Sequence, residues 1–282
     1  MIIDIHTHVF PPEFIRHRTD YASDDEGFRL LYGSLQSKMI PVEKMLESMD
    51  ASGVEKSVIF GFPWKNDRIS KTHNDYIIES IQQYPDRFIG FCCLDPFNSN
   101  AADEVIRCLD AGLTGVGEIA FYNRGLDDDV LESLKTIMKI CLDRSVPVMI
   151  HTNEPIGHTY QGKAPITLLQ IYNLARCYPD NKIILAHWGG GIFFYNALKK
   201  EVKESMQNIY FDTAASPFLY DSRVYKLAIE LAGLEKILFG SDFPLISPTR
   251  YFKEIKSTEL NQNEIDNICG NNAMKLLGRE SK

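Results

Sequence analysis

The sequence has no long apolar run and no excess of positive charge. No segment approaches the roughly 20 apolar residues that a membrane-spanning helix requires. Met1 leads directly into a short apolar segment, without the basic region and small-residue cleavage site of a secretory leader. The net charge of −8 does not favour a sequence-independent grip on nucleic-acid phosphates, although a local basic patch is compatible with this total. We therefore expect a cytoplasmic protein whose partner is neither a membrane nor a nucleic acid.

The cysteines lack the paired spacing of a structural zinc site. A chain of 282 residues is also long enough to bury a large core without disulfide bonds. We expect reduced thiols within strands and helices at all six positions, which are Cys92, Cys93, Cys108, Cys141, Cys177 and Cys269.

Internal divisions are missing as well. The chain has no internal repeat, no low-complexity segment and no linker rich in Pro, Gly or Ser. Its length exceeds that of a typical domain, but α/β barrels run to about 250 residues as one unit. We predict one domain over residues 1–282.

What the sequence does contain is an alternation of short apolar runs with amphipathic segments. Short apolar runs bounded by turn residues are typical of buried parallel strands. Eight such runs cover residues 2–6, 56–61, 88–94, 114–119, 147–151, 183–187, 208–212 and 237–241. Helical periodicity marks residues 42–52, 74–84, 101–111, 128–143, 164–178, 192–205, 221–232 and 262–277. Eight alternations predict a (β/α)8 barrel of the α/β class. An open doubly wound sheet is the alternative, but it usually has fewer strands and a glycine-rich phosphate loop, which we do not find.

Residues 10–40 form the longest segment without a clear pattern. Connections between elements usually run about 2–6 residues, so this one is unusually long. Because it follows the first strand, it lies at the rim where a barrel binds its substrate. We predict an irregular loop that acts as a lid or substrate wall.

Residues of the types that bind metals stand in the first predicted strand and at the ends of later ones. His6 and His8 are two residues apart, so their imidazoles leave the same face of the strand and can share one metal ion. Four more ligand-type residues end other predicted strands, namely Glu118, His151, His187 and Asp242. Because a barrel builds its catalytic site at the carboxyl ends of its strands, we expect these side chains to converge on a divalent metal.

Two metal arrangements are chemically sensible. In one, two ions share a bridging Glu118, the first ion being held by His6, His8 and Asp242 and the second by His151 and His187. In the other, a single ion leaves His187 free as an acid or base and is held by His6, His8, His151 and Asp242. Imidazole and carboxylate ligands suit zinc, which we expect first, and also manganese and iron.

Contacts to a substrate are predicted from position along the chain. Arg124 follows the strand that ends at Glu118, and a guanidinium suits a substrate carboxylate. His158 lies after the fifth strand and Trp64 after the second. We take Arg124, His158 and Trp64 as candidate substrate-binding residues. His17 and His73 are interpreted as structural.

Five motifs, spread over nearly the whole chain, together resemble the amidohydrolase superfamily of metal-dependent barrels. They are Ile3-Asp4-Ile5-His6-Thr7-His8, Tyr84-Pro85-Asp86-Arg87-Phe88, Ala186-His187-Trp188-Gly189-Gly190-Gly191, Leu238-Phe239-Gly240-Ser241-Asp242-Phe243-Pro244 and Gly270-Asn271-Asn272-Ala273. The set is similar in particular to the amidohydrolase-related branch, which contains aminocarboxymuconate-semialdehyde decarboxylase and related decarboxylases, hydratases and lactonases. The resemblance implies that His187 is a second-metal ligand or a catalytic acid/base. It also implies metal ligands at His6, His8, His151 and Asp242.

One motif departs from that branch. Gly117-Glu118-Ile119 places a glutamate at a strand end where the decarboxylases have none. It resembles the Gly-Glu-Ile of TatD-type metal-dependent nucleases and other two-metal hydrolases, in which the glutamate bridges the ions. This departure moves the expected reaction from decarboxylation to hydrolysis.

We therefore expect a metal-dependent hydrolase of a small, carboxylate-bearing amide, lactone or ester. Metal-activated water would attack the carbonyl, Asp242 would accept the proton of that water, and His187 would be the second catalytic residue. One alternative is a decarboxylase of an unsaturated or aromatic acid on a single-metal site. Another is a metal-binding barrel without catalysis. The sequence leaves the oligomeric state open, and a homo-oligomer is compatible with it.

Overall fold

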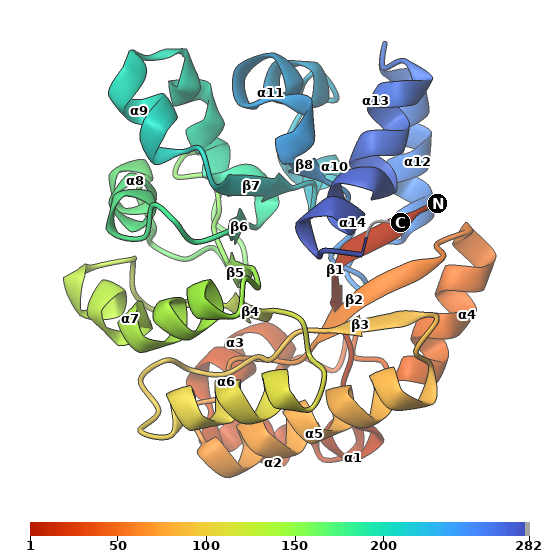
Figure 1. Cartoon of the computed structure of the whole chain (residues 1–282). Helices are drawn as coiled ribbons and strands as arrows, with labels where there is room; N and C mark the ends of the chain where they lie inside the picture. The colour runs from red at the N-terminus through yellow and green to blue at the C-terminus, as the bar shows by residue number, and fades with distance from the viewer. Residues whose placement is uncertain (280–282) are drawn as a thin grey trace.

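In the computed structural model, which describes residues 1–279, parallel strands form a central ring and helices surround it (Figure 1). The strands are β1 (Ile3–His8), β2 (Lys56–Phe60), β3 (Phe88–Gly90), β4 (Val116–Ile119), β5 (Val148–Ile150), β6 (Ile183–Leu185), β7 (Ile209–Asp212) and β8 (Ile237–Leu238). They pair in the orders β1-β2-β3 and β4-β5-β6-β7-β8. Single parallel bridges from Cys92 to Val116 and from Thr7 to Phe243 join the two groups and close the ring. The predicted (β/α)8 barrel is confirmed.

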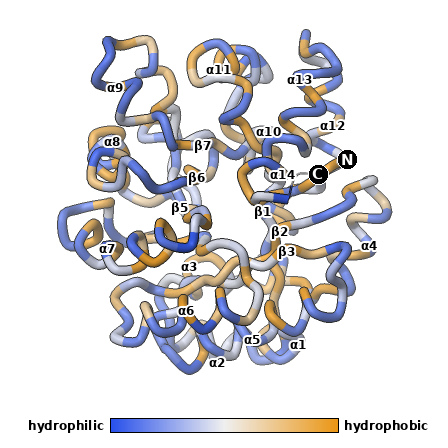
Figure 2. The backbone as a smooth tube through the Cα atoms, in the orientation of Figure 1, coloured by the Kyte–Doolittle hydropathy of each residue, from blue (hydrophilic) through white to orange (hydrophobic). Residues whose placement is uncertain are grey.

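Helices follow the strands and cover the outside of the ring. They are α1 (Pro12–Arg16), α2 (Arg18–Asp24), α3 (Glu26–Tyr32), α4 (Val42–Ser52), α5 (Asp67–Gln83), α6 (Ala101–Asp110), α7 (Asp128–Asp143), α8 (Leu168–Cys177), η1 (His187–Ala197), α9 (Lys200–Ser205), α10 (Ser216–Leu219), α11 (Val224–Ala232), η2 (Leu234–Lys236), α12 (Pro248–Ser257), α13 (Gln262–Asp266), η3 (Asn267–Asn271) and α14 (Asn272–Leu276). Apolar and polar residues alternate along the outer helices, because each has one face on the sheet and one in solvent (Figure 2).

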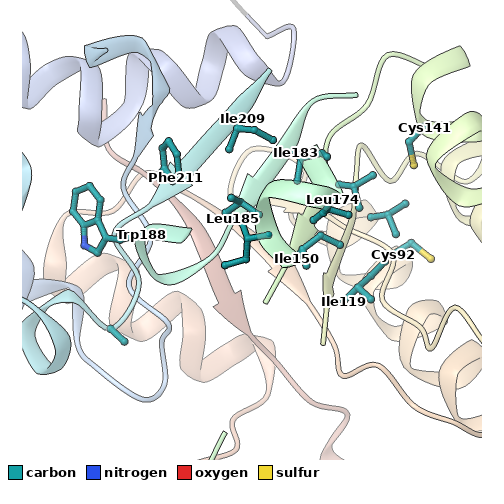
Figure 3. Close-up of a cluster of buried hydrophobic side chains, with 14 of the residues drawn as sticks. Cys92, Ile119, Cys141, Ile150, Leu174, Ile183, Leu185, Trp188, Ile209 and Phe211 are labelled. Carbon is teal, nitrogen blue, oxygen red and sulfur yellow. The ribbon is translucent and has the colours of Figure 1, made fainter. Parts of the chain in front are cut away.

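The strands separate two apolar cores. Ile119, Ile150, Leu185 and Phe211, from β4 to β7, pack outward against the helices in one cluster (Figure 3). Alternate strand residues, such as Met149, belong to a second cluster inside the barrel. This division follows from the period of two along a strand, which sends neighbouring side chains to opposite faces. Both faces are therefore apolar, as the continuous apolar runs of the sequence predict.

Residues 10–40 correct the prediction of an irregular loop. They contain the three short helices α1 to α3, and the Asp25 side chain caps α3 by accepting a hydrogen bond from the backbone N of Phe28. Phe14 and Phe28 are buried in an aromatic cluster, which stabilises helices too short to be stable alone. The role of this segment as a lid stays a prediction.

The helix predicted over residues 192–205 is also corrected. Helix η1 already begins at His187, and Trp188 and three successive glycines there have positive φ, a conformation that glycine adopts without steric cost. Regular α-helix is limited to α9, because Leu198 is extended and interrupts the chain between η1 and α9. The Gly-rich motif thus forms a tight turn at the end of β6.

Two further features bear on the sequence-based expectations. All six cysteines are free thiols, and all except Cys177 are buried. Among the described residues, no helix combines the length and apolarity needed to span a membrane. The division of the chain into a single domain stays a prediction.

Candidate metal centre

The ligand-type side chains predicted from strand ends lie together in the barrel. They form three overlapping groups, and within each group the ligand atoms lie within 4.8 Å of one another. The groups are His6 with His8 and Glu118, His6 with His187 and Asp242, and Glu118 with His151 and His187. Because the ends of β1, β4, β5, β6 and β8 meet at one rim, residues far apart in sequence converge there.

The His6 and His8 rings face each other through their Nε2 atoms, which are 3.3 Å apart. Nδ1 of His6 lies 2.8 Å from Asp212 Oδ2, and Nδ1 of His8 lies 3.3 Å from the Gly61 carbonyl oxygen. Since these oxygens only accept, each Nδ1 carries the proton and each Nε2 presents a lone pair. Two ligand nitrogens at about 2.1 Å from one ion lie roughly 3–3.4 Å apart, so a shared cation fits this geometry.

The other two histidines are held in the same manner. His187 Nδ1 donates to the Ala214 carbonyl oxygen at 3.2 Å, and its Nε2 faces Glu118 Oε1 at 3.6 Å. His151 Nε2 donates to the Gly162 carbonyl oxygen at 3.0 Å, and its Nδ1 lies 2.9 Å from Glu118 Oε1. Each ring therefore has one nitrogen on an outer oxygen and the other directed at the cluster. Metal-ligating histidines are oriented in this way, and the donor set fits a divalent cation.

The backbone is constrained at two of these residues. His187 and Asp242 have φ values of 55° and 58°, in the left-handed region that few residues other than glycine adopt. Hydrogen bonds hold both: His187 N donates to Asp212 Oδ1 at 2.8 Å, and Asp242 N donates to the His6 carbonyl oxygen at 2.9 Å. Such conformations cost about 1–3 kcal/mol each and cluster at functional sites.

The charges of the cluster favour ionised carboxylates. Burial alone lowers the pKa of His6, but Glu118, Asp212 and Asp242 outweigh burial and raise this pKa to about 10. Burial disfavours ionisation of Glu118, yet His6 and His151 hold the pKa of this carboxyl well below its usual range. Without an ion these carboxylates favour a protonated His6, and a bound divalent cation would take the place of that proton, which leaves the His6 Nε2 lone pair for the metal.

A cavity of about 540 Å³ opens onto the cluster. Its lining includes His8, Glu118, His151, His187 and Asp242 from the cluster. Aromatic side chains make up much of the remaining wall, namely Tyr32, Tyr122, Tyr160 and Phe218. His158 also lines the cavity, as its position after β5 predicts, and Lys38 is the only Lys or Arg in the described lining.

Two predicted substrate contacts lie outside the cavity lining. Arg124 is not part of the cavity lining, because its guanidinium turns to Asp127, at 2.5 Å, and lies over the Phe97 ring. Trp64 is fully buried in the aromatic cluster of residues 10–40, and its Nε1 donates to His73 Nδ1 at 3.0 Å. Both side chains follow strands of the barrel, but local partners direct them away from the cavity.

The two histidines interpreted as structural lie outside the cluster. His73 is buried and its Nε2 donates to the Val9 carbonyl oxygen at 2.8 Å, so both of its nitrogens are satisfied. Burial lowers the pKa of His73 to about 4, and this histidine is neutral at pH 7. His17 is exposed beside Asp20, at 3.6 Å.

Sequence reasoning missed several residues of the site. Asp212 orients His6 and the backbone of His187, and it ends the seventh apolar run just as the chosen ligands end theirs. The strand-end rule therefore applies to Asp212 as well. Tyr32 and Tyr122 had no comparable signal, because one lies in a short helix and the other in a loop.

A comparison with protein families decides where the chain belongs. Residues 3–279 match the sequence model of the family described as Amidohydrolase. The chain belongs to this family. It is accordingly an enzyme of the amidohydrolase superfamily, similar to the branch that the motifs indicated.

Individual relatives are similar over almost their full lengths. The 2-amino-3-carboxymuconate-6-semialdehyde decarboxylase of Dictyostelium discoideum is 23% identical, covering 98% of this chain and 91% of that protein. The structure of 5-carboxyvanillate decarboxylase from Sphingomonas paucimobilis superimposes with a TM-score of 0.78 at 16% identity, covering 98% of each chain. Dihydroxybenzoic acid decarboxylase from Polaromonas sp. JS666, solved with manganese and 2-nitroresorcinol, gives 0.72 at 19% identity, covering 100% of this chain and 98% of that one. At these identities the solved structures establish the fold.

The relatives overturn the expectation of a hydrolase. All three carry the name of a decarboxylase, which fits the alternative of a decarboxylase rather than hydrolysis. The expectation of zinc is not confirmed either, since the solved relative from Polaromonas contains manganese.

Proposed function

We propose that the protein is a metal-dependent decarboxylase of a small aromatic or unsaturated acid. The observation that carries the proposal is the position of the ligand cluster, which borders a cavity walled by Tyr32, Tyr122, Tyr160 and Phe218. Such a cavity suits a flat substrate whose polar end meets the cluster. The decarboxylase names of the relatives support the same reaction.

The proposed ligands of a single ion are His6, His8, His151 and Asp242. Their donor atoms suit manganese and zinc alike, and elemental analysis of the purified protein decides between these metals. When bound, a divalent ion would draw electron density from a substrate oxygen and stabilise developing negative charge.

His187 is proposed to hold the proton of the reaction. When the bond to the carboxyl group breaks, carbon dioxide leaves and the electron pair stays on the substrate carbon, which must then take a proton. Burial alone lowers the pKa of His187, but Glu118 and Asp242 outweigh it and raise this pKa, so the imidazolium is favoured. Its Nδ1 is fixed by Ala214, and Nε2 is the nitrogen on the cluster side. This nitrogen is the group proposed to deliver the proton to carbon.

Asp242 is proposed to serve both as ligand and as the anion that stabilises the charged His187. Burial disfavours its ionisation, but His8, His6 and His187 lower the pKa of Asp242 below its ordinary value. His158 and Tyr160, which line the cavity, are the proposed substrate-binding residues.

The test is a decarboxylation assay in deuterated water. Manganese-loaded and zinc-loaded protein is incubated with 2,6-dihydroxybenzoate, 5-carboxyvanillate and related unsaturated acids while carbon dioxide is measured. The expected product carries one deuterium at the carbon that lost the carboxyl group. His187→Asn should abolish product formation while the protein keeps its metal. Absence of carbon dioxide from every acid, with metal bound, would sink the proposal.

A further inference from the structure

The loop between β5 and α8 is closed at its neck by a buried asparagine. Asn153 Oδ1 accepts a hydrogen bond from Ala164 N at 2.8 Å, and Asn153 Nδ2 donates to the Ala164 carbonyl oxygen at 3.1 Å. These two bonds hold together the ends of the segment Glu154–Lys163, which we name the wall loop. Loops closed in this way are packed by their own side chains.

A single lysine fills the interior of the wall loop. Lys163 Nζ lies 2.8 Å from Glu154 Oε1 and donates to the carbonyl oxygens of Ile156 at 3.2 Å and His158 at 3.1 Å. The side chains of Lys163 and Glu154 are only 12% and 18% exposed. Tyr160 donates its hydroxyl hydrogen to the second oxygen of Glu154 at 2.8 Å, and its ring lies against the ammonium.

The wall loop reaches the candidate metal centre through its backbone. Gly162, adjacent to Lys163, is buried, and its carbonyl oxygen accepts the hydrogen bond from His151 Nε2 at 3.0 Å. That bond fixes the tautomer in which the Nδ1 lone pair faces the cluster. The same loop presents His158 and Tyr160 to the cavity.

We propose that Lys163 and Glu154 are positioning residues, which orient His151 toward the metal. Through the wall loop they also hold His158 and Tyr160 at the cavity. The inference rests on the proposed function only in that the cluster binds a divalent cation. Neither side chain contributes to the cavity lining or the ligand groups, so both act through the residues that they hold. Removing the ammonium leaves the Glu154 carboxylate without its cationic partner and releases two backbone carbonyls, which lets Gly162 move away from His151.

The test compares Lys163→Met with a matched control, Lys226→Met. Lys226 pairs with Glu264 at 3.1 Å, and Glu264 is 14% exposed, so the control also breaks a partly buried pair. Chelator-treated proteins are titrated with Mn²⁺ alone. We expect Lys163→Met to weaken Mn²⁺ binding about 10–100-fold, the usual effect of disturbing a group that orients a ligand. The Mn²⁺ affinity of the control should stay within twofold of the wild-type value. Its Tm should change by about as much as that of Lys163→Met.

A second pair of variants guards against simple misfolding. Glu154→Gln keeps the size of the side chain and an acceptor for Tyr160, and it should weaken Mn²⁺ binding in the same direction. If the two residues act as one unit, the double variant should be no weaker than Lys163→Met. In an active enzyme, KM should rise more than kcat falls, because the substrate wall moves while His187 stays in place.

The inference would be overturned if the wild type, Lys163→Met and Glu154→Gln had equal Mn²⁺ affinities. It would also be overturned if the Lys226→Met control lost as much Mn²⁺ affinity as Lys163→Met. The metal titration does not depend on carbon dioxide release. A wild type that binds Mn²⁺ but releases no carbon dioxide would therefore overturn the proposed function and leave this inference standing.

Discussion

The buried Asp212 carboxylate contacts His6 and His187 at once. Its Oδ2 accepts from His6 Nδ1 at 2.8 Å, and its Oδ1 accepts from the backbone N of His187 at 2.8 Å. One side chain on β7 therefore fixes the ring of a proposed ligand on β1 and the backbone of the proposed proton donor after β6. The two proposed functions of the site, metal binding and proton delivery, therefore depend on the same carboxylate.

Asp212→Asn should weaken metal binding while the fold is kept. Asparagine has the same size, but its amide is neutral and a poorer acceptor for the His6 N–H, so the imidazole becomes a weaker ligand. We expect an affinity for Mn²⁺ or Zn²⁺ lower by about 10–100-fold, measured by titration of chelator-treated protein. Asp221→Asn is the control, because Asp221 pairs with Arg223 at the surface. Unchanged affinity would show that Asp212 does not orient a ligand.

Glu118→Gln should change proton delivery more than metal content. We expect one equivalent of metal in both the wild type and the variant, measured by elemental analysis. Because Glu118 raises the pKa of His187 and the acid form is the proposed donor, the alkaline limb of kcat should move to lower pH in the variant. A shift of about one pH unit corresponds to about 1.4 kcal/mol. Two equivalents in the wild type and one in the variant would instead favour a bridged pair of ions.

Arg124→Ala should leave the kinetics nearly unchanged. The guanidinium pairs with Asp127 and Asp129 outside the cavity, and it is 38% exposed. We expect kcat/KM within about threefold of the wild type, since exposed ion pairs contribute only about 0–1 kcal/mol. His158→Ala is the comparison, because His158 lines the cavity and its loss should raise KM. A tenfold decrease of kcat/KM in Arg124→Ala would show that this residue contributes to substrate binding.

His73 should make the protein less stable in acid. Its pKa falls from 6.5 to about 4 on folding because the ring is buried, so the unfolded chain binds more protons between these values. The stability contributed by the neutral ring is therefore complete above pH 6.5 and is lost as the pH falls toward 4. Between pH 7.5 and 5 this group alone should lower the free energy of unfolding by about 2 kcal/mol.

Urea titration of the wild type and His73→Gln measures this effect. The variant should be less stable at pH 7.5, because Trp64 Nε1 and the Val9 carbonyl oxygen lose their buried partner. When the pH falls from 7.5 to 5, its free energy of unfolding should also decrease by about 2 kcal/mol less than that of the wild type. Parallel pH dependences of the two proteins would assign the acid sensitivity to other groups.

The strand-end residues were predictable because barrel geometry converts a position in sequence into a position in space. Any residue that ends an apolar run meets the others at one rim, which is why His151 and Asp242 could be placed before the structure was known. Arg124 and Trp64 could not be placed in this way, since the direction of a loop side chain depends on the partners it meets. Asp127 and the buried aromatic cluster are such partners, and neither is visible as a pattern.

The short helices of residues 10–40 show a second limit. Helices of five to seven residues complete at most two turns, too few for a periodic apolar face to be recognised.

The reaction was mispredicted for a different reason, which concerns the role given to Glu118. Glu118 was interpreted as a bridge between two ions because of the Gly-Glu-Ile motif, whereas a carboxylate can equally raise the pKa of a neighbouring imidazole such as His187.

Pairing between the first and last strands makes the metal centre dependent on the whole chain. Thr7 bridges to Phe243, and Ser241 N donates to Asp4 Oδ1 across 237 residues of sequence. During synthesis His6 and His8 emerge before the rest of the cluster, yet they have no Asp242 beside them until β8 and the residues after it have been added. Contacts this distant in sequence form late, because closing so long a chain loses entropy before any contact compensates it. Metal uptake should therefore report the last step of folding, and a chain that stops before β8 should emerge from the ribosome unable to retain its ion.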